Sequence, residues 1–325
     1  MKPTRIADGS NGSLTRRDFL KRVGAGVAAA MAAHAVAGAV HTAHASEGVT
    51  EDTPAVLIDL TRCIGCNSCA LACKAENNLP NPESAPTGLS NEAFTFVSTI
   101  QLETPEGETL TRHAKRQCMH CLNPACVSAC PAAAMYRSPE GPIVYRAERC
   151  LGCRYCQIAC PFDVPAFDWG NPLTPVISKC WLCRDRLNAG EQPACVAACP
   201  TGALRFGTRR QLLAQAHALI ASNPDRYVDH VFGEHEVGGT SMLYVSDIPF
   251  AELGFPADLP HSAPPEETAK VMEALPAVIL GMGALAAGTA TYTHRRSAAH
   301  DTPHARHGAA EPPPADASTS EREEL

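Results

Sequence analysis

Four groups of four cysteines account for all sixteen cysteines of this chain, and they constrain its fold more than any other feature. The first and third groups have the spacing C-x2-C-x2-C-x3-C. The second widens one gap to four residues, and the fourth widens the same gap to eleven. The groups are Cys63, Cys66, Cys69 and Cys73; Cys118, Cys121, Cys126 and Cys130; Cys150, Cys153, Cys156 and Cys160; and Cys180, Cys183, Cys195 and Cys199.

This spacing suits cubane iron–sulfur clusters, which need one thiolate at each of four iron corners. The bacterial ligand run is C-x2-C-x2-C-x3-C-P, and its fourth cysteine ligates the other cluster of a two-cluster protein. A proline follows three of the groups here, as Pro131, Pro161 and Pro200. We therefore expect four 4Fe–4S clusters as cofactors. The alternatives are zinc, which is usually held by two C-x2-C pairs, and disulfides, which such close neighbours would close into strained rings.

The N-terminus carries an export pattern. Residues 15–21 read TRRDFLK, which fits a twin-arginine signal, and a weakly apolar run follows from Val23 to Val40. Ala43-His44-Ala45 fits the small-x-small rule for cleavage. We expect a signal peptide over residues 1–45, with an uncleaved membrane anchor as the alternative. Because this route exports folded proteins, clusters inserted in the cytoplasm would reach the periplasm intact.

A second apolar run lies near the C-terminus. Residues 274–293 carry no charge, and this length spans a bilayer as a helix. Arg295 and Arg296 follow the run directly, so the positive-inside rule places the C-terminus in the cytoplasm and the cysteines in the periplasm. The alternative is a buried helix of a soluble domain. We expect a Pro-rich linker at 256–273, a single-pass inner-membrane helix at 274–293 and a disordered tail at 294–325.

Residues 46–255 are expected to form one α+β domain. Strands are predicted at 53–60, 142–146 and 242–245, and a β-hairpin at 94–113, with strands at 94–102 and 109–113. A capping box at 208–211 predicts a helix to about Ser222. The net charge of −7 argues against a nucleic-acid partner. No nucleophile–base pair or phosphate loop is apparent, so we expect a subunit without catalytic residues.

Five polar residues near the cysteines are candidates for a ligand or proton-relay role. We instead expect them to supply packing and charge balance around anionic clusters, because neighbouring donors tune a cluster without binding it. These residues are His120, Asp163, Asp168, Arg184 and Arg186.

Two stretches resemble the four-cluster iron–sulfur subunits of bacterial respiratory oxidoreductases: QCMHCLNPACVSACP at Gln117–Pro131 and CRYCQIACPFDVP at Cys153–Pro165. With the export signal, the C-terminal helix and GGTSMLYVSDIPFAEL at 238–253, the chain is most similar to the subunits of membrane-bound [NiFe] uptake hydrogenases. The resemblance implies a tandem ferredoxin-like domain with an inserted β-hairpin. It would relay electrons from periplasmic hydrogenase large and small subunits to a quinone-reactive membrane subunit. The alternatives are the β subunit of a formate dehydrogenase or other molybdopterin oxidoreductase, and an independent membrane-tethered polyferredoxin.

The same resemblance implies that groups one and four pair, that groups two and three pair, and that the fourth cysteines cross over. Lys74 departs from the pattern, because the other groups have proline there. We therefore expect Cys73 to lie in a looser turn. The implied ligand sets are Cys63, Cys66, Cys69 and Cys199 for cluster 1; Cys180, Cys183, Cys195 and Cys73 for cluster 2; Cys118, Cys121, Cys126 and Cys160 for cluster 3; and Cys150, Cys153, Cys156 and Cys130 for cluster 4.

Overall fold

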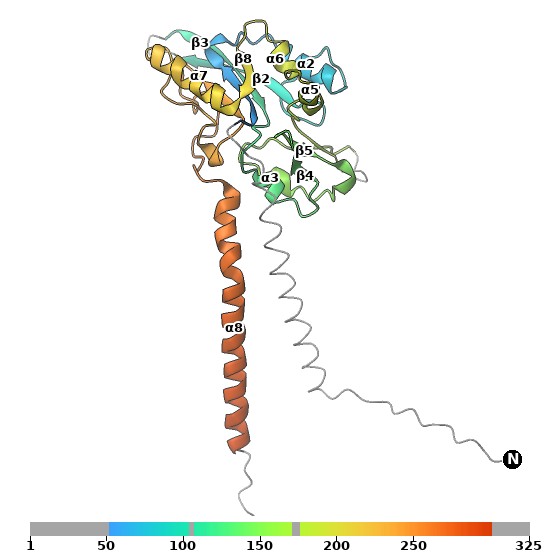
Figure 1. The fold of residues 1–325 in the computed structure, drawn as a ribbon, viewed down its shortest axis with the longest axis vertical. Helices are drawn as coiled ribbons and strands as arrows, with labels where there is room; N and C mark the ends of the chain where they lie inside the picture. Colours follow the sequence, from blue (N-terminus) through green and yellow to red (C-terminus); the bar gives the residue numbers. More distant parts are fainter. Residues whose placement is uncertain (1–51, 104–106, 171–175, 301–325) are drawn as a thin grey trace, which may run out of the picture. The chain divides into compact units, whose positions relative to one another are not determined.

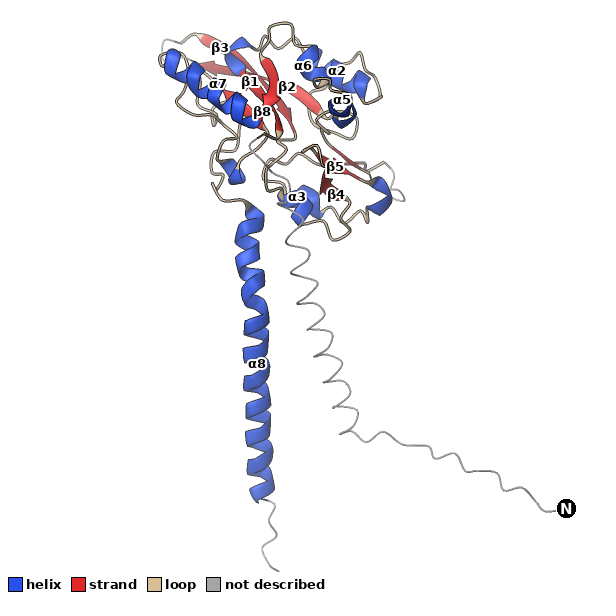
Figure 2. Ribbon diagram, viewed as in Figure 1, coloured by secondary structure: helices blue, strands red, loops and turns tan. Residues whose placement is uncertain are grey.

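The computed structural model describes residues 52–103, 107–170 and 176–300, and it divides into one unit ending at Val271 and another beginning at Met272. The signal peptide and most of the tail expected from the sequence lie outside the described residues. All sixteen cysteines belong to the first unit. Figure 1 follows the chain by colour, and Figure 2 separates helices from strands.

The first unit mixes short helices with short strands, as expected for an α+β domain (Figure 2). Its strands are β1 (Pro54–Asp59), β2 (Thr95–Glu103), β3 (Thr109–Gln117), β4 (Met135–Arg137), β5 (Ile143–Tyr145), β6 (Ala166–Phe167), β7 (Ile177–Ser178), β8 (Leu204–Thr208) and β9 (Met242–Val245). Its α-helices are α2 (Ser68–Glu76), α3 (Ala125–Ser128), α4 (Tyr155–Ile158), α5 (Arg184–Asn188), α6 (Ala194–Ala197) and α7 (Arg209–Ser222), and its 3₁₀ helices are η1 (Leu60–Arg62), η2 (Ala147–Arg149) and η3 (Glu236–Gly238).

A three-stranded sheet of order β8-β1-β9 organises the core. The central strand β1 is antiparallel to β8 and parallel to β9. Successive side chains of a strand point to opposite faces, so β1 serves two cores. Ala55 and Leu57 pack in a cluster with α7, whereas Val56 and Ile58 belong to a larger cluster on the other face. The sheet therefore has one face covered by α7 and one face turned toward the cysteines.

The helix α7 confirms the prediction from its capping box. The Thr208 hydroxyl accepts from the Gln211 amide, and the Gln211 side chain accepts from the Thr208 amide. These bonds satisfy donors that a helix start leaves unpaired. Leu212, Ala216 and Ile220 then lie on one face at helical spacing and are buried against the sheet.

The predicted strands near 53–60, 142–146 and 242–245 are confirmed as β1, β5 and β9. β2 and β3 form an antiparallel pair in which Thr95 faces Gln117 and Glu103 faces Thr109. The sequence ended the second of these strands at His113, but β3 continues to Gln117. The charged run HAKRQ looks like exposed surface, yet Ala114, Lys115 and Gln117 are buried. The strand therefore runs directly into Cys118, the first residue of the second cysteine group.

The predicted linker at 256–273 is wrong in two respects. The helix α8 (Pro264–His300) begins inside it, with Glu266 and Glu267 in its first turn. Proline at a helix start and acidic first-turn residues both favour initiation there. Upstream of α8, the carbonyls of Pro260 and His261 accept hydrogen bonds from η3 amides, and Ala263 is fully buried. The segment is thus packed on the domain rather than loose.

Within the described residues, one helix, α8, has the length and the apolar composition needed to cross a membrane. It includes the predicted span at 274–293 and continues to His300, so residues 294–300 are helical rather than part of a disordered tail. Pro276 lies inside the helix. The remaining tail lies outside the described residues.

Gly233 sits at a backbone position that excludes a side chain. Its φ is +97°, and a Cβ atom there would lie 2.3 Å from the carbonyl oxygen of Met242 in β9. We expect Gly233→Ala to lower the free energy of unfolding by about 3 kcal/mol, because the strain of a positive φ and the clash with the Met242 carbonyl both destabilise the folded state. The melting temperature measured by circular dichroism should be lower in this variant. Gly88→Ala is the matched control, since nothing lies within 4 Å of its Cβ position, and an equal loss there would contradict this explanation.

Candidate iron–sulfur sites

The four cysteine groups share one local geometry. In each group the third cysteine lies on a short helix: Cys69 in α2, Cys126 in α3, Cys156 in α4 and Cys195 in α6. In three groups the helix has four residues and ends two positions before the fourth cysteine. The proline after that cysteine lacks an amide hydrogen and cannot continue a helix. In these three groups the helix therefore stops just before the fourth cysteine.

The first group differs because Lys74 replaces the proline. Here α2 continues for nine residues, and Cys73 lies within it rather than just after it. The looser turn that we expected at Cys73 is therefore wrong. A lysine can donate its amide in a helix where proline cannot, so the helix continues, and Cys73 is buried.

Pairing of β1 with β8 brings the first and last groups together. β1 leads through η1 into Cys63, and β8 follows Cys199 after a short turn. Because β1 and β8 are antiparallel neighbours, the end of β1 lies beside the start of β8. Cys63 and Cys199 therefore lie at the same end of the sheet. Four cysteines line one space, and they are Cys63, Cys66, Cys69 and Cys199.

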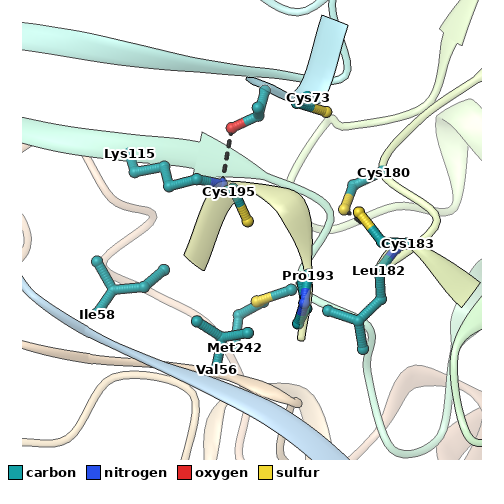
Figure 3. A pocket seen from close by; sticks show the side chains of 11 residues that line it. Val56, Ile58, Cys73, Lys115, Cys180, Leu182, Cys183, Pro193, Cys195 and Met242 are labelled. Atoms are coloured by element: carbon teal, nitrogen blue, oxygen red, sulfur yellow. Dashed lines mark hydrogen bonds between the residues drawn. The ribbon is translucent and has the colours of Figure 1, made fainter. Parts of the chain in front are cut away.

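A second space has Cys195 of α6 in its lining. Figure 3 shows its lining, which includes Cys73, Cys180, Cys183 and Cys195 together with Lys115. Cys195 and Cys199 belong to the same short segment but line different spaces. Three thiols of one group and the last thiol of another thus gather at each space.

The causes of the pKa shifts in groups two and three indicate that the fourth cysteine of each group lies near the thiols of the other. Burial and then the nearby Cys118 and Cys160 thiols raise the pKa of Cys126, opposed by Lys179. Burial and then the thiols of Cys130, Cys150 and Cys153 raise the pKa of Cys156 to about 11. Cys160 of group three thus neighbours the thiols of group two, and Cys130 of group two neighbours those of group three.

Burial raises the pKa of several of these thiols, which favours their neutral form in the absence of metal. It raises the pKa of Cys69 to about 11 and that of Cys180 to about 12. The pKa of Cys199 shifts the other way, because hydrogen bonds from the Leu204 amide and the Thr201 hydroxyl outweigh the effect of burial and lower it. Iron binding requires thiolates, so loading these sites releases protons.

The donor set fits a cluster better than a single ion. Zinc draws its ligands to about 2.3 Å from one centre, but no group of three Cys, His, Asp or Glu side chains in the described residues converges in this way. All sixteen cysteines are free thiols. Thiols placed around a space, rather than at a point, match the corners of a 4Fe–4S cube, and these residues fit that cofactor.

The five polar residues that the sequence analysis named near the cysteines form ion pairs or hydrogen bonds, or lie in turns. Arg184 pairs with Glu140 at 3.3 Å, and Arg186 pairs with Glu191 at 2.9 Å and with Glu76 at 3.2 Å. The Asp168 carboxylate accepts from the Gly170 amide, and the left-handed Asp163 follows Cys160 in a turn. His120 is buried, and its Nδ1 accepts from the Ile143 amide at 3.1 Å. None of them lines the two spaces described above.

Sequence reasoning missed Lys115, which lines both spaces. The signal was present in the alternation of β3, where Lys115 and Gln117 share a face that ends at Cys118. It was hidden because lysine is seldom buried without a partner.

Comparison with known proteins matches this geometry. The model of the 4Fe-4S dicluster domain family matches residues 111–209, which include the second, third and fourth cysteine groups. The hydrogenase-2 operon protein HybA of Escherichia coli O157:H7 is 32% identical over 280 residues, which cover 75% of this chain and 84% of HybA. The chain belongs to the family of iron–sulfur subunits that includes HybA.

Two further relatives are similar to this chain. The iron–sulfur subunit of nitrate-inducible formate dehydrogenase from Escherichia coli K12 is 36% identical over 217 residues, or 63% of this chain and 72% of that subunit. A protein of Nitratidesulfovibrio vulgaris whose name states no function is 39% identical over 294 residues, or 87% of this chain and 78% of its own length. The prediction of an iron–sulfur electron-transfer subunit of respiratory oxidoreductases is confirmed.

Proposed function

We propose that the chain holds four 4Fe–4S clusters in series and relays electrons between a periplasmic [NiFe] hydrogenase and a quinone-reactive membrane subunit. The observation that carries this proposal is the gathering of thiols into sets of four, each drawn from two groups. The ligand sets of this proposal are those that the resemblance implies, beginning with Cys63, Cys66, Cys69 and Cys199 for cluster 1, and the linings of the two spaces support the first two of them. When bound, the clusters supply one-electron carriers, and the protein fixes their spacing and surroundings.

Neighbouring thiols support a linear order of these sets. The charge of Cys195, in the second set, contributes to the raised pKa of Cys69, in the first set. In the same way, Cys118 of the third set contributes to the raised pKa of Cys180 in the second. Cys156 of the fourth set contributes to the raised pKa of Cys126 in the third. An electron that enters at one end would therefore pass through two interior clusters before leaving at the other. The tandem arrangement of two ferredoxin-like halves follows from the same pairing.

The two end sets are also the ones open to the surface. Among the sixteen cysteines, Cys66 and Cys153 are exposed, and they belong to the first and fourth sets. An apolar side chain stands beside each: Ile64 is 61% exposed and Leu151 is 71% exposed. Exposed apolar residues next to a redox centre suit transient or stable contact with another electron-transfer protein. This supports docking of a catalytic subunit at one end and a membrane subunit at the other.

The membrane topology belongs to the same proposal. A single pass by α8 would hold the cluster domain at the periplasmic face of the inner membrane, with the cytoplasmic C-terminus set by Arg295 and Arg296. The twin-arginine pattern gives the same orientation from the other end of the chain. A chain exported with its own signal favours a hydrogenase partner by analogy with the family.

A formate dehydrogenase β subunit is the second candidate. The formate dehydrogenase-O iron–sulfur subunit of Escherichia coli K12 is 34% identical over 75% of this chain, the same share that HybA covers. Likeness in the electron-transfer subunit thus leaves the catalytic partner to experiment. An independent polyferredoxin, the third candidate, would not purify in fixed proportion with one enzyme.

Metal analysis of the complex that co-purifies with this chain from mildly solubilised membranes tests the proposal. We expect iron together with nickel, and the chain in a fixed ratio to hydrogenase subunits. Molybdenum or tungsten in place of nickel would move the chain to the formate dehydrogenase branch. Zinc without iron, or a colourless preparation, would overturn the assignment of clusters altogether.

A further inference from the structure

Lys115 lies between the two spaces that the first and second cysteine sets surround. Its side chain lines both of them, and no other described residue is common to the two linings. Figure 3 shows it among Cys73, Cys180 and Cys195 at one of these spaces. The residue is 3% exposed. A cationic group therefore stands, away from water, at the boundary between two candidate cluster sites.

Hydrogen bonds fix the position of the ammonium group. Lys115 Nζ donates to Thr95 Oγ1 at 2.9 Å and to Gln117 Oε1 at 2.8 Å. The Gln117 side chain donates in turn to the Tyr244 hydroxyl at 2.8 Å, and that hydroxyl donates to the Lys115 carbonyl at 3.0 Å. This closed and buried network joins β2, β3 and β9. A long lysine side chain that would otherwise sample many rotamers is thus held in one place.

The usual partner of a buried ammonium is a carboxylate, but none forms an ion pair with Lys115 in the described residues. Burying an unpaired charge costs several kcal/mol, so the compensating anions must come from elsewhere. Burial alone would lower the pKa of Lys115, but once cluster binding makes thiolates of Cys195, Cys69 and Cys180, their negative charge raises that pKa. These thiols belong to both cysteine sets.

We propose that Lys115 is a positioning charge shared by clusters 1 and 2, one that raises the reduction potentials of both. This inference rests on the proposed function. A cube with four thiolates is anionic, and accepting one electron from a neighbouring cluster adds one negative charge without a proton. A fixed positive charge stabilises that reduced form more than the oxidised form.

The test is a redox titration of the full complex, followed by electron paramagnetic resonance, with Lys115→Met compared with wild type. We expect the reduction equilibria of clusters 1 and 2 to fall at least tenfold, which is about 59 mV for a one-electron couple. Clusters 3 and 4 should move much less. Lys115→Arg should keep both potentials near their original values, because it keeps the charge.

Arg116 supplies the matched control. It is the next residue of β3 and faces the other way, with its guanidinium 3.7 Å from the centre of the Phe255 ring. Arg116→Leu removes a partly buried cation from the same strand without touching either space. Unchanged potentials in Lys115→Met, or equal shifts in Arg116→Leu, would overturn the inference.

Iron content separates this inference from the proposed function. A wild-type complex without iron on this chain would end the proposed function, whereas loaded variants with unmoved potentials would end only the role of Lys115. Should Lys115→Met fail to bind its clusters, Lys115→Gln keeps a donor toward Thr95 and is expected to lower the same two potentials. If both neutral variants lose iron while Lys115→Arg retains it, the charge is needed for assembly, and the proposal of tuning is wrong.

Discussion

Alanine at Cys66 and alanine at Cys199 are expected to remove the same cluster, although these residues are far apart in the sequence. Both thiols line one space, so either change leaves cluster 1 with three ligands. The double variant should therefore lose no more iron than either single variant, about four atoms per chain. Each variant should also stop electron transfer from the catalytic subunit to quinone, because a series of carriers fails when one is missing.

Cys195 provides the control for this result. It lies four residues before Cys199, on the same turn of chain, but it lines the other space. The double variant Cys195→Ala/Cys199→Ala should lose two clusters, or about eight iron atoms. Autonomous groups would reverse both outcomes: loss of one cluster for the Cys195 and Cys199 pair, and of two for the Cys66 and Cys199 pair. Iron analysis and counting of paramagnetic signals in the purified complex distinguish the two arrangements.

The physical reason for the crossing lies in a long-range strand pair. Cysteine spacing predicted the candidate cluster ligands, because the ligands of one loop are close in sequence. It did not predict which groups meet, since that depends on antiparallel pairing of β1 with β8 across the whole domain. The ligand sets came instead from the resemblance to a family. The structure supplies a cause for them, in that the strand before Cys63 and the strand after Cys199 are neighbours.

Other differences from the sequence prediction also have local causes. A single residue, Lys74, decides whether a helix ends before its last cysteine or runs past it. The helix α8 starts early because prolines and acidic residues suit a first turn as well as a linker. The burial of Lys115 was hidden because the sulfurs that would compensate its charge as thiolates belong to distant segments. The first two errors concern where a helix begins or ends, and only the burial of Lys115 depends on tertiary contacts.

Removal of iron is expected to unfold one part of the domain before the other. The cluster of buried residues around groups two and three has five members, Met135, Ile143, Cys156, Phe167 and Ile177, and three of the five partly buried residues against it are cysteines. A core of this size cannot support a fold by itself, so metal–thiolate bonds must supply the stability. We expect residues 125–180 to become sensitive to protease when the full chain is treated with a chelator and an oxidant.

The sheet with α7 should persist under the same treatment. Its buried cluster of nine residues contains no cysteine, and it joins β1, β9 and α7 directly. Hydrogen exchange on the iron-free chain should therefore show protected amides in these elements and rapid exchange in β4 to β7. Leu212→Ala is the matched variant, because it opens a cavity in the iron-independent core and should cost about 2–5 kcal/mol there. It should remove that residual protection while leaving cluster binding at groups two and three intact. Uniform loss of protection after iron removal in the unmodified chain would show instead that the clusters hold the whole domain as one cooperative unit.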